Sequence, residues 1–350
     1  MYLNDKKTYI TFDDVLIQPQ FSDISSREEI STATSFLGLN LEIPILSSNM
    51  DYVTGSSMAI AMWKTGGLGI LHRFMPWEEQ KKELLAMKEF EVPLSFSVGV
   101  KNRDEILYHI EEIRPLIASS PLPVIICIDI AHGHHKNVGE TILVLKSKFN
   151  NIKIIAGNVA TVQGAGYLAY CGADAIKVGI GPGSICTTRE VTGVGVPQLS
   201  ALMGIATWKE EYYKKVQIIA DGGIKSSGDI VKALAAGADV VMLGSLLAGT
   251  SECPGEAVEM PDGRRYRPYR GQSIFGTNGL RYAPEGVSGF VEEKGPVSGV
   301  LKRLVGGLRS GMSYVGARNL DELREDAIFI KVSSQTHIES GTRILTSIGE

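Results

Sequence analysis

The chain has 350 residues, a formal net charge of −4 at neutral pH and 44% hydrophobic residues. This balance excludes broad electrostatic attraction to nucleic acid or to an anionic membrane, so we expect neither as a partner. The four cysteines lack the paired spacing of a disulfide framework or a CxxC metal site, and the polar N-terminus is unlike a signal peptide. No run approaches the ~18 apolar residues of a membrane span, and we predict a cytoplasmic protein. Glycine, with 39 residues, exceeds its usual share and implies turns or close approach to a ligand.

Short apolar runs alternate with helix-like segments along the first two thirds of the chain. The runs are residues 44–49, 68–72, 94–100, 124–130, 153–159, 175–180, 217–223 and 240–245. Most are nearly continuous in Ile and Val, as is typical of strands buried on both faces. Helix-like segments between them include 77–90, 137–149, 161–173 and 226–238. Eight such repeats predict an α/β fold, the TIM (β/α)8 barrel. A doubly wound sheet is the alternative, but its GxGxxG fingerprint is absent after the first run.

A long segment follows the eighth run. We interpret residues 1–350 as a single catalytic barrel domain, with an active-site loop at about 179–200 and a flap at about 250–300. Helix-like sequence resumes only from residue 301. Long excursions from a compact domain are usually functional. The basic, aromatic segment 264–270 inside the flap is interpreted as a local hairpin or an anion contact rather than as a nucleic-acid site.

Glycine-bearing turns end the last two predicted strands. They are DGGI (221–224) and LGSL (243–246), and each precedes a helix. A TIM barrel has its active site at the carboxyl ends of its strands and commonly binds phosphate at these two turns, on backbone amides. We therefore expect a phosphorylated small molecule as the ligand.

Cys186 lies in the most glycine-rich segment of the chain, residues 177–201. Its neighbours are polar, unlike those of Cys127, which lies inside an apolar run. A cysteine in a polar loop at the predicted active-site end is a candidate nucleophile. Cys171 and Cys253 are interpreted as structural. The histidines of HGHH (132–135) lack partner ligands at a metal-motif spacing, so a loop role is favoured over a zinc site.

Several motifs together resemble one enzyme family. They are FDDVLIQP (12–19), SSNMD (47–51), AHGH (131–134), AGN (156–158), GPGSICTT (181–188), DGGI (221–224), MLGSLLAGT (242–250), YRG (269–271), PEG (284–286) and GGLRSGMSYVGA (306–317). The chain resembles the IMP dehydrogenase/GMP reductase family over essentially its whole length.

The resemblance implies covalent chemistry at C2 of a purine nucleotide. In the dehydrogenase direction Cys186 attacks IMP, hydride leaves to NAD⁺, and a flap pair, Arg281 and Tyr282, activates the water that releases XMP. In the reductase direction Cys186 captures GMP, ammonia departs and NADPH reduces the adduct to IMP, with Thr188 and Glu285 taking part. Either route divides one difficult exchange into two easier steps.

The resemblance also implies binding residues. Substrate contacts are expected from Ser48, Met50, Ser184, Asp221, Gly223, Gly244, Ser245, Tyr269, Gly271, Gln272 and Glu285. Cofactor contacts are expected from Asp129 on the nicotinamide ribose and from His132, Asn158 and Gly179. Potassium is expected on backbone carbonyls of Gly181, Gly183 and Cys186, completed by Glu339 and Ser340 of a neighbouring subunit in a homotetramer.

Departures from the family pattern bear on the direction of the reaction. The regulatory CBS modules common after the second strand are absent, and Arg281-Tyr282 lies unusually close to Glu285; both features resemble reductases. Gln272 replaces the methionine that commonly follows YRG. GSLLAGT and GVGVPQ instead resemble dehydrogenases, and we favour the NAD-dependent IMP dehydrogenase, with the NADPH-dependent GMP reductase as the alternative. Other hypotheses are a nucleotide-binding regulatory protein without activity and, more distantly, a flavin-dependent barrel oxidoreductase.

Overall fold

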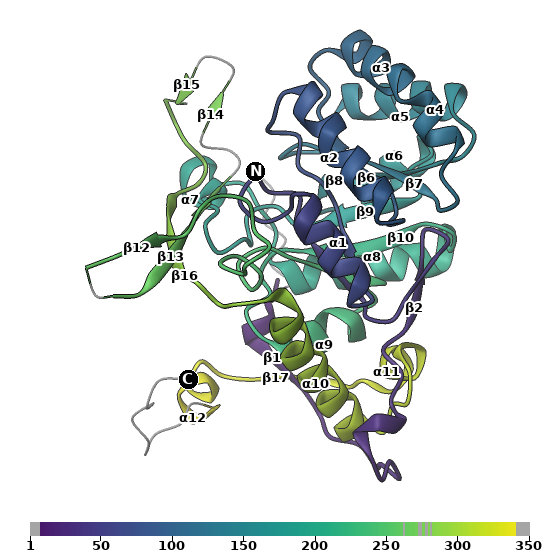
Figure 1. The fold of residues 1–350 in the computed structure, drawn as a ribbon. Helices are drawn as coiled ribbons and strands as arrows, with labels where there is room; N and C mark the ends of the chain where they lie inside the picture. The colour runs from purple at the N-terminus through teal and green to yellow at the C-terminus, as the bar shows by residue number, and fades with distance from the viewer. Residues whose placement is uncertain (1–7, 262, 272–274, 277–278, 281, 341–350) are drawn as a thin grey trace.

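The barrel predicted from the sequence is present. The computed structural model describes residues 8–261, 263–271, 275–276, 279–280 and 282–340. One parallel sheet has the strand order β5-β4-β11-β10-β9-β8-β7-β6 (Figure 1). Its strands are β4 (Ile45–Ser47), β5 (Leu68–Gly69), β6 (Ser95–Val98), β7 (Val124–Asp129), β8 (Ile152–Val159), β9 (Ala175–Val178), β10 (Gln217–Asp221) and β11 (Val240–Leu243). A parallel bridge between Leu71 and Phe96 joins the β5 and β6 edges and closes the sheet. Each predicted apolar run coincides with one strand to within a few residues, and the TIM barrel is confirmed.

Helices cover the outside of the barrel. They are α1 (Ser56–Lys64), α2 (Trp77–Glu89), α3 (Arg103–Glu112), α4 (Arg114–Ala118), α5 (Lys136–Lys148), α6 (Val162–Tyr170), α8 (Gln198–Tyr212), α9 (Ser227–Ala235), α10 (Val297–Val315) and α11 (Leu320–Asp326). Two short helices lie elsewhere: α7 (Thr188–Thr192) in the loop that carries Cys186, and α12 (Gln335–Ser340) after β17. Thr161 and Ser226 cap the amino ends of α6 and α9 through their side-chain oxygens. Gly172 and Gly237 follow the last turns with φ of 104° and 99°, so glycine ends both helices. Among the described residues, no helix is long and apolar enough to cross a bilayer.

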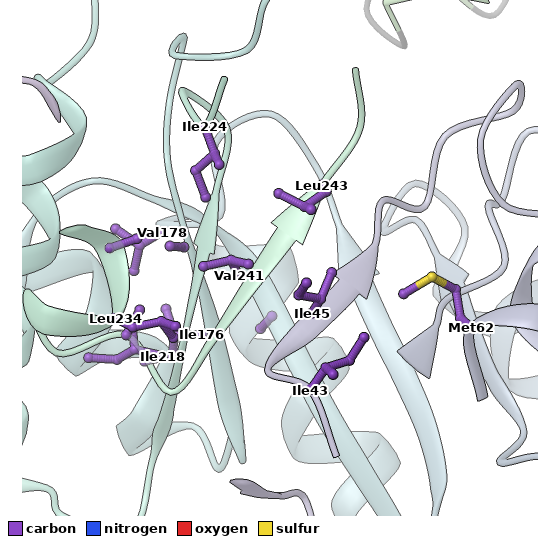
Figure 2. Packing of buried hydrophobic residues seen from close by; sticks show 14 of the residues in the cluster. Ile43, Ile45, Met62, Ile176, Val178, Ile218, Ile224, Leu234, Val241 and Leu243 are labelled. Carbon is purple, nitrogen blue, oxygen red and sulfur yellow. The ribbon is translucent and has the colours of Figure 1, made fainter. Parts of the chain in front are cut away.

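Strand side chains point alternately to two apolar clusters. Ile125, Ile155 and Ile219 belong to the cluster inside the barrel, beside the hairpin of β2 (Thr34–Phe36) and β3 (Leu39–Leu41). The next residues along each strand face the helices; Figure 2 shows Leu234 of α9 beside Ile176 and Ile218. Burying each such side chain contributes about 1.5–3 kcal/mol. Alternation on a sheet buried on both faces explains why the runs are continuously apolar.

The segment after β11 forms a small antiparallel sheet rather than a structureless loop. Its strands are β12 (Val258–Glu259), β13 (Arg265–Arg270) and β16 (Ser288–Glu292), and a short pair, β14 (Phe275–Gly276) and β15 (Gly279–Leu280), extends beyond it. In Figure 1 this sheet projects from the side of the barrel that carries α7. The β12–β13 pair confirms the hairpin predicted around 264–270. Arg270 holds the sheet to the barrel through an ion pair with Asp51.

The helix expected from residue 301 begins earlier, at Val297. Gly299 lowers the helix propensity of this start, but Val297 and Val300 are buried against the barrel, and packing outweighs propensity. Farther along, β17 (Phe329–Lys331) pairs antiparallel with β1 (Val15–Ile17), so segments from near both ends of the chain lie side by side.

Candidate active site

Two cavities adjoin at the carboxyl ends of the barrel strands. The first has a volume of about 340 Å³ and the second about 770 Å³. Their walls share four residues, Ser48, Met50, Cys186 and Asp221. Cys186 is half-buried and follows β9. A nucleophile between two cavities can meet a ligand from each side at once.

Turns and hydroxyl groups build the first cavity. It is lined by ten of the predicted substrate contacts, namely Ser48, Met50, Ser184, Asp221, Gly223, Gly244, Ser245, Tyr269, Gly271 and Glu285. At Gly244 an added Cβ would lie 3.2 Å from the Tyr269 hydroxyl and 3.3 Å from the Met50 sulfur, so a side chain there would crowd two residues of the cavity wall. Burial raises the pKa of Tyr269 to about 12, which keeps its hydroxyl protonated as a donor.

A chain of hydrogen bonds runs from the thiol to a carboxylate. The Cys186 Sγ donates to Thr188 Oγ1 at 3.2 Å, and Thr188 Oγ1 donates to Glu285 Oε2 at 2.8 Å. A backbone bridge between Cys186 and Gly286 holds the glutamate segment against the cysteine loop. Three of the five predicted catalytic residues are therefore brought together, in an order that can carry a proton away from sulfur.

The second cavity has charged side chains from inside the barrel in its wall. The predicted cofactor residues Asp129, Asn158 and Gly179 line it. Asn158 Nδ2 donates to Gly179 O at 2.9 Å and to Asp221 Oδ2 at 2.8 Å, which ties the second cavity to the first. The Lys177 ammonium lies 2.7 Å from Asp129 Oδ1.

Comparison with known proteins agrees with this geometry. A family model described as the IMP dehydrogenase / GMP reductase domain matches residues 9–343. The chain belongs to this family. Proteins named inosine-5'-monophosphate dehydrogenase are among its relatives: it is 36% identical to one from Aquifex aeolicus (95% of each chain). It is 38% identical to one from Cryptosporidium parvum (95% of this chain, 94% of the relative) and 35% to one from Bacillus subtilis (93% and 94%).

Some residues expected from the family pattern lie outside the cavities. His132 is exposed and lines neither cavity, since the chain turns at Gly133, whose N–H bonds Asn158 O at 2.6 Å. His135 caps α5 through Nδ1, which agrees with a loop role for this histidine. Tyr282 is fully exposed and lines neither cavity. Gln272 and Arg281 lie outside the described residues.

The predicted potassium ligands lie in two separate parts of the chain, the loop that carries Cys186 and the helix α12. The Gly183 carbonyl accepts from the Cys186 N–H at 3.1 Å. The Arg189 side chain packs against Gly181 and donates to Ile180 O at 3.3 Å and Val196 O at 2.6 Å, so it binds carbonyls beside the predicted ligands. Glu339 and Ser340 are exposed on α12, which is drawn well apart from α7 in Figure 1. Carbonyl oxygens suit a hard cation, and potassium stays a prediction.

Lys177 and Arg73 are site residues that the sequence analysis missed. The Lys177 side chain is only 3% exposed, yet it lines the second cavity; Arg73 Nε donates to Asp129 O at 3.0 Å. The sequence does contain a signal for Lys177, since it is a lysine inside the otherwise apolar run AIKVGI and a buried charge needs a partner.

Proposed function

We propose that this protein is an NAD-dependent IMP dehydrogenase, converting IMP, NAD⁺ and water to XMP and NADH through a covalent thioimidate on Cys186. The position of Cys186 in the wall between the two cavities carries the proposal. The relatives named above support it, since each bears the name of that dehydrogenase.

The first cavity would hold the nucleotide. Its phosphate would lie at the turns of Gly223 and Gly244, where backbone N–H groups and the Ser245 and Tyr269 hydroxyls can donate. Asp221 would accept from the ribose hydroxyls. As sulfur bonds C2, the thiol proton passes by way of Thr188 toward Glu285, and the C2 hydrogen departs with its electron pair. Water then adds at C2, the C–S bond breaks, and the thiol is restored with XMP as the product.

The second cavity would hold the dinucleotide. When bound, the nicotinamide ring accepts the hydride. The residues present fit such a ligand: Asp129 offers a carboxylate to ribose hydroxyls, and Asn158 and Gly179 complete the wall next to Cys186. The cavity's volume of about 770 Å³ is in the range of small-molecule sites.

Water activation is assigned to Arg281 and Tyr282 by resemblance alone. Replacing either residue should slow hydrolysis of the covalent adduct more than the first hydride transfer. Pre-steady-state absorbance of NADH then shows an unchanged burst followed by a slower steady rate. Equal loss in both phases would assign the pair to ligand binding.

Several finer expectations belong to this proposal. They are a homotetramer, potassium dependence, a cytoplasmic location and one catalytic domain without CBS modules. Supporting the last, residues 90–94 alone connect α2 to β6. The Aquifex alignment covers 469 positions, more than this chain's length, so that relative has residues with no counterpart here.

GMP reductase is the alternative; the relatives named above do not favour it, and the Thr188–Glu285 hydrogen bond could serve either direction. A paired assay separates the two: IMP with NAD⁺, followed by NADH formation, and GMP with NADPH, followed by ammonia release. We expect turnover with IMP and NAD⁺. Turnover only with GMP would reverse the direction, nucleotide binding without turnover would indicate a regulatory protein, and a yellow purified protein would point to flavin.

A further inference from the structure

A buried lysine lies between the carboxylates of both cavities. Lys177 Nζ is 2.7 Å from Asp129 Oδ1 and 3.3 Å from Asp221 Oδ2. It also donates to Asn49 Oδ1 at 3.0 Å, on the loop after β4. Asp221 lines both cavities, whereas Asp129 and Lys177 line only the second. One ammonium group therefore contacts an acceptor of each cavity.

Strand register explains why these side chains meet. Asp129, Lys177 and Asp221 each lie two residues beyond a side chain of the inner cluster, so all three point into the barrel. Gly157 on β8 is paired with Asp129 on one side and with Lys177 on the other. A Cβ at Gly157 would lie 2.6 Å from the Lys177 Cβ. The missing side chain on β8 lets residues of β7 and β9 form an ion pair across it.

We propose that Lys177 is a positioning residue shared by the two cavities, holding Asp221 for the nucleotide and Asp129 for the dinucleotide. This inference rests on the proposed function, which places a ribose at each carboxylate. Two carboxylates on either side of one ammonium group repel each other and lose solvation on burial, so a cation between them is needed to hold both in position. Loss of Lys177 should therefore weaken nucleotide binding in a cavity that Lys177 does not line.

The charges around Asp129 predict how loss of Lys177 changes the pH dependence of turnover. Burial opposes ionisation, but Lys177, Arg73 and Asn49 outweigh it and keep the pKa of Asp129 below its ordinary value. The same carboxylates raise the pKa of Lys177 despite its burial, while burial raises the pKa of Cys127 to about 12 and leaves it neutral. Without Lys177 the like charge of Asp221 remains, so the pKa of Asp129 should rise and the acid limb of kcat/KM for NAD⁺ should move to higher pH.

Calorimetry of IMP binding without dinucleotide, together with pH profiles of turnover, tests the inference. For Lys177→Met we expect roughly tenfold weaker IMP binding, the range of a hydrogen bond to a charged group, and the shifted acid limb. Lys177→Arg retains the cation and should restore most of the affinity and the original limb. The matched control is Lys209→Met, which removes another part-buried pair, Lys209–Asp239 (2.9 Å), outside both cavities and should leave IMP binding and the limb unchanged.

A variant with balanced charge serves as the control for folding. Lys177→Met with Asp129→Asn leaves the same net charge as the wild type in this cluster, and it should fold and still bind IMP weakly. Wild-type affinity and an unmoved acid limb in folded Lys177→Met would overturn the inference. So would failure of both variants to fold while Lys209→Met folds, since Lys177 would then be a structural residue. A wild-type protein that neither binds nor converts IMP would instead refute the proposed function.

Discussion

The two cavities are built in contrasting ways. The first is lined by glycine turns and hydroxyl groups that end the last two barrel strands, and the side chains that complete it come from the cysteine loop and the added sheet. The second takes charged side chains, Asp129 and Lys177, from strands inside the barrel. Backbone turns suit a phosphate, which needs many N–H donors, and strand side chains suit ribose hydroxyls, which need a fixed acceptor. The change with the largest expected effect on both cavities is at Cys186, which lies in the wall between them.

Replacing Cys186 with alanine should lower turnover by roughly 10³-fold or more, because no other group in the shared wall can form the covalent adduct. Binding of IMP and of NAD⁺, measured separately by calorimetry, should stay within about threefold of wild type, since each cavity keeps its own walls. Unchanged turnover would refute covalent catalysis at this residue. Cys253→Ala is the matched control, because Cys253 is buried outside both cavities.

Glu285→Gln keeps the shape of the side chain but removes the carboxylate that receives the Thr188 hydrogen bond. We expect kcat to fall by about 10²–10⁴-fold, the usual range for a general base, with KM values little changed. Steady-state kinetics at several pH values measures this. A rise in KM for IMP with unaltered kcat would instead make Glu285 a binding residue.

Asp129→Ala tests whether the two cavities bind different ligands. It removes an acceptor of the second cavity only, so KM for NAD⁺ should rise about tenfold to a hundredfold. KM for IMP should remain near its wild-type value, because Lys177 keeps its contact with Asp221. Initial-rate kinetics with one substrate varied at a time measures both constants. An equal rise in both would contradict the division of the site.

Tyr269→Phe alters the first cavity instead of the second, and its expected effect is the smallest of these changes. The loss of one neutral hydroxyl next to Gly244 should raise KM for IMP about threefold to tenfold and leave KM for NAD⁺ unchanged. With the pKa of Tyr269 raised to about 12, the hydroxyl stays protonated up to about pH 10. The ratio of wild type to variant should therefore be constant across that range, and a ratio that changes near neutral pH would contradict the assignment.

The features predicted from the sequence are those set by backbone rules. Eight buried strands show in their apolar runs. The turn of DGGI shows because Gly222 and Gly223 have φ of 90° and 80°, which few other residues adopt, and LGSL shows because its glycine follows the last apolar run. Cys186 could be selected because its polar setting differs from that of Cys127.

Other features depend on contacts that only the fold creates. Lys177 belongs to the site because Gly157, on another strand, leaves space for it. The sequence indicates a hairpin around 264–270 but not the third strand, β16, because the strands of this sheet are short and polar and β13 contains Pro268. β12 pairs only with residues 265 and 266, so the proline lies where β13 has an open edge. His132 was assigned from a motif, but the turn at Gly133 directs it outward.

The pairing of β1 with β17 has a consequence for how the protein is made. Thr11, Phe12 and Asp13 form part of the wall of the first cavity and lie just before β1, whose partner β17 is among the last segments to be synthesised. A chain emerging from the ribosome with its amino end first can build barrel strands before that partner exists. The wall of the first cavity is therefore supported by β17 only near the end of translation. A truncated product that lacks β17 should bind purine nucleotides weakly.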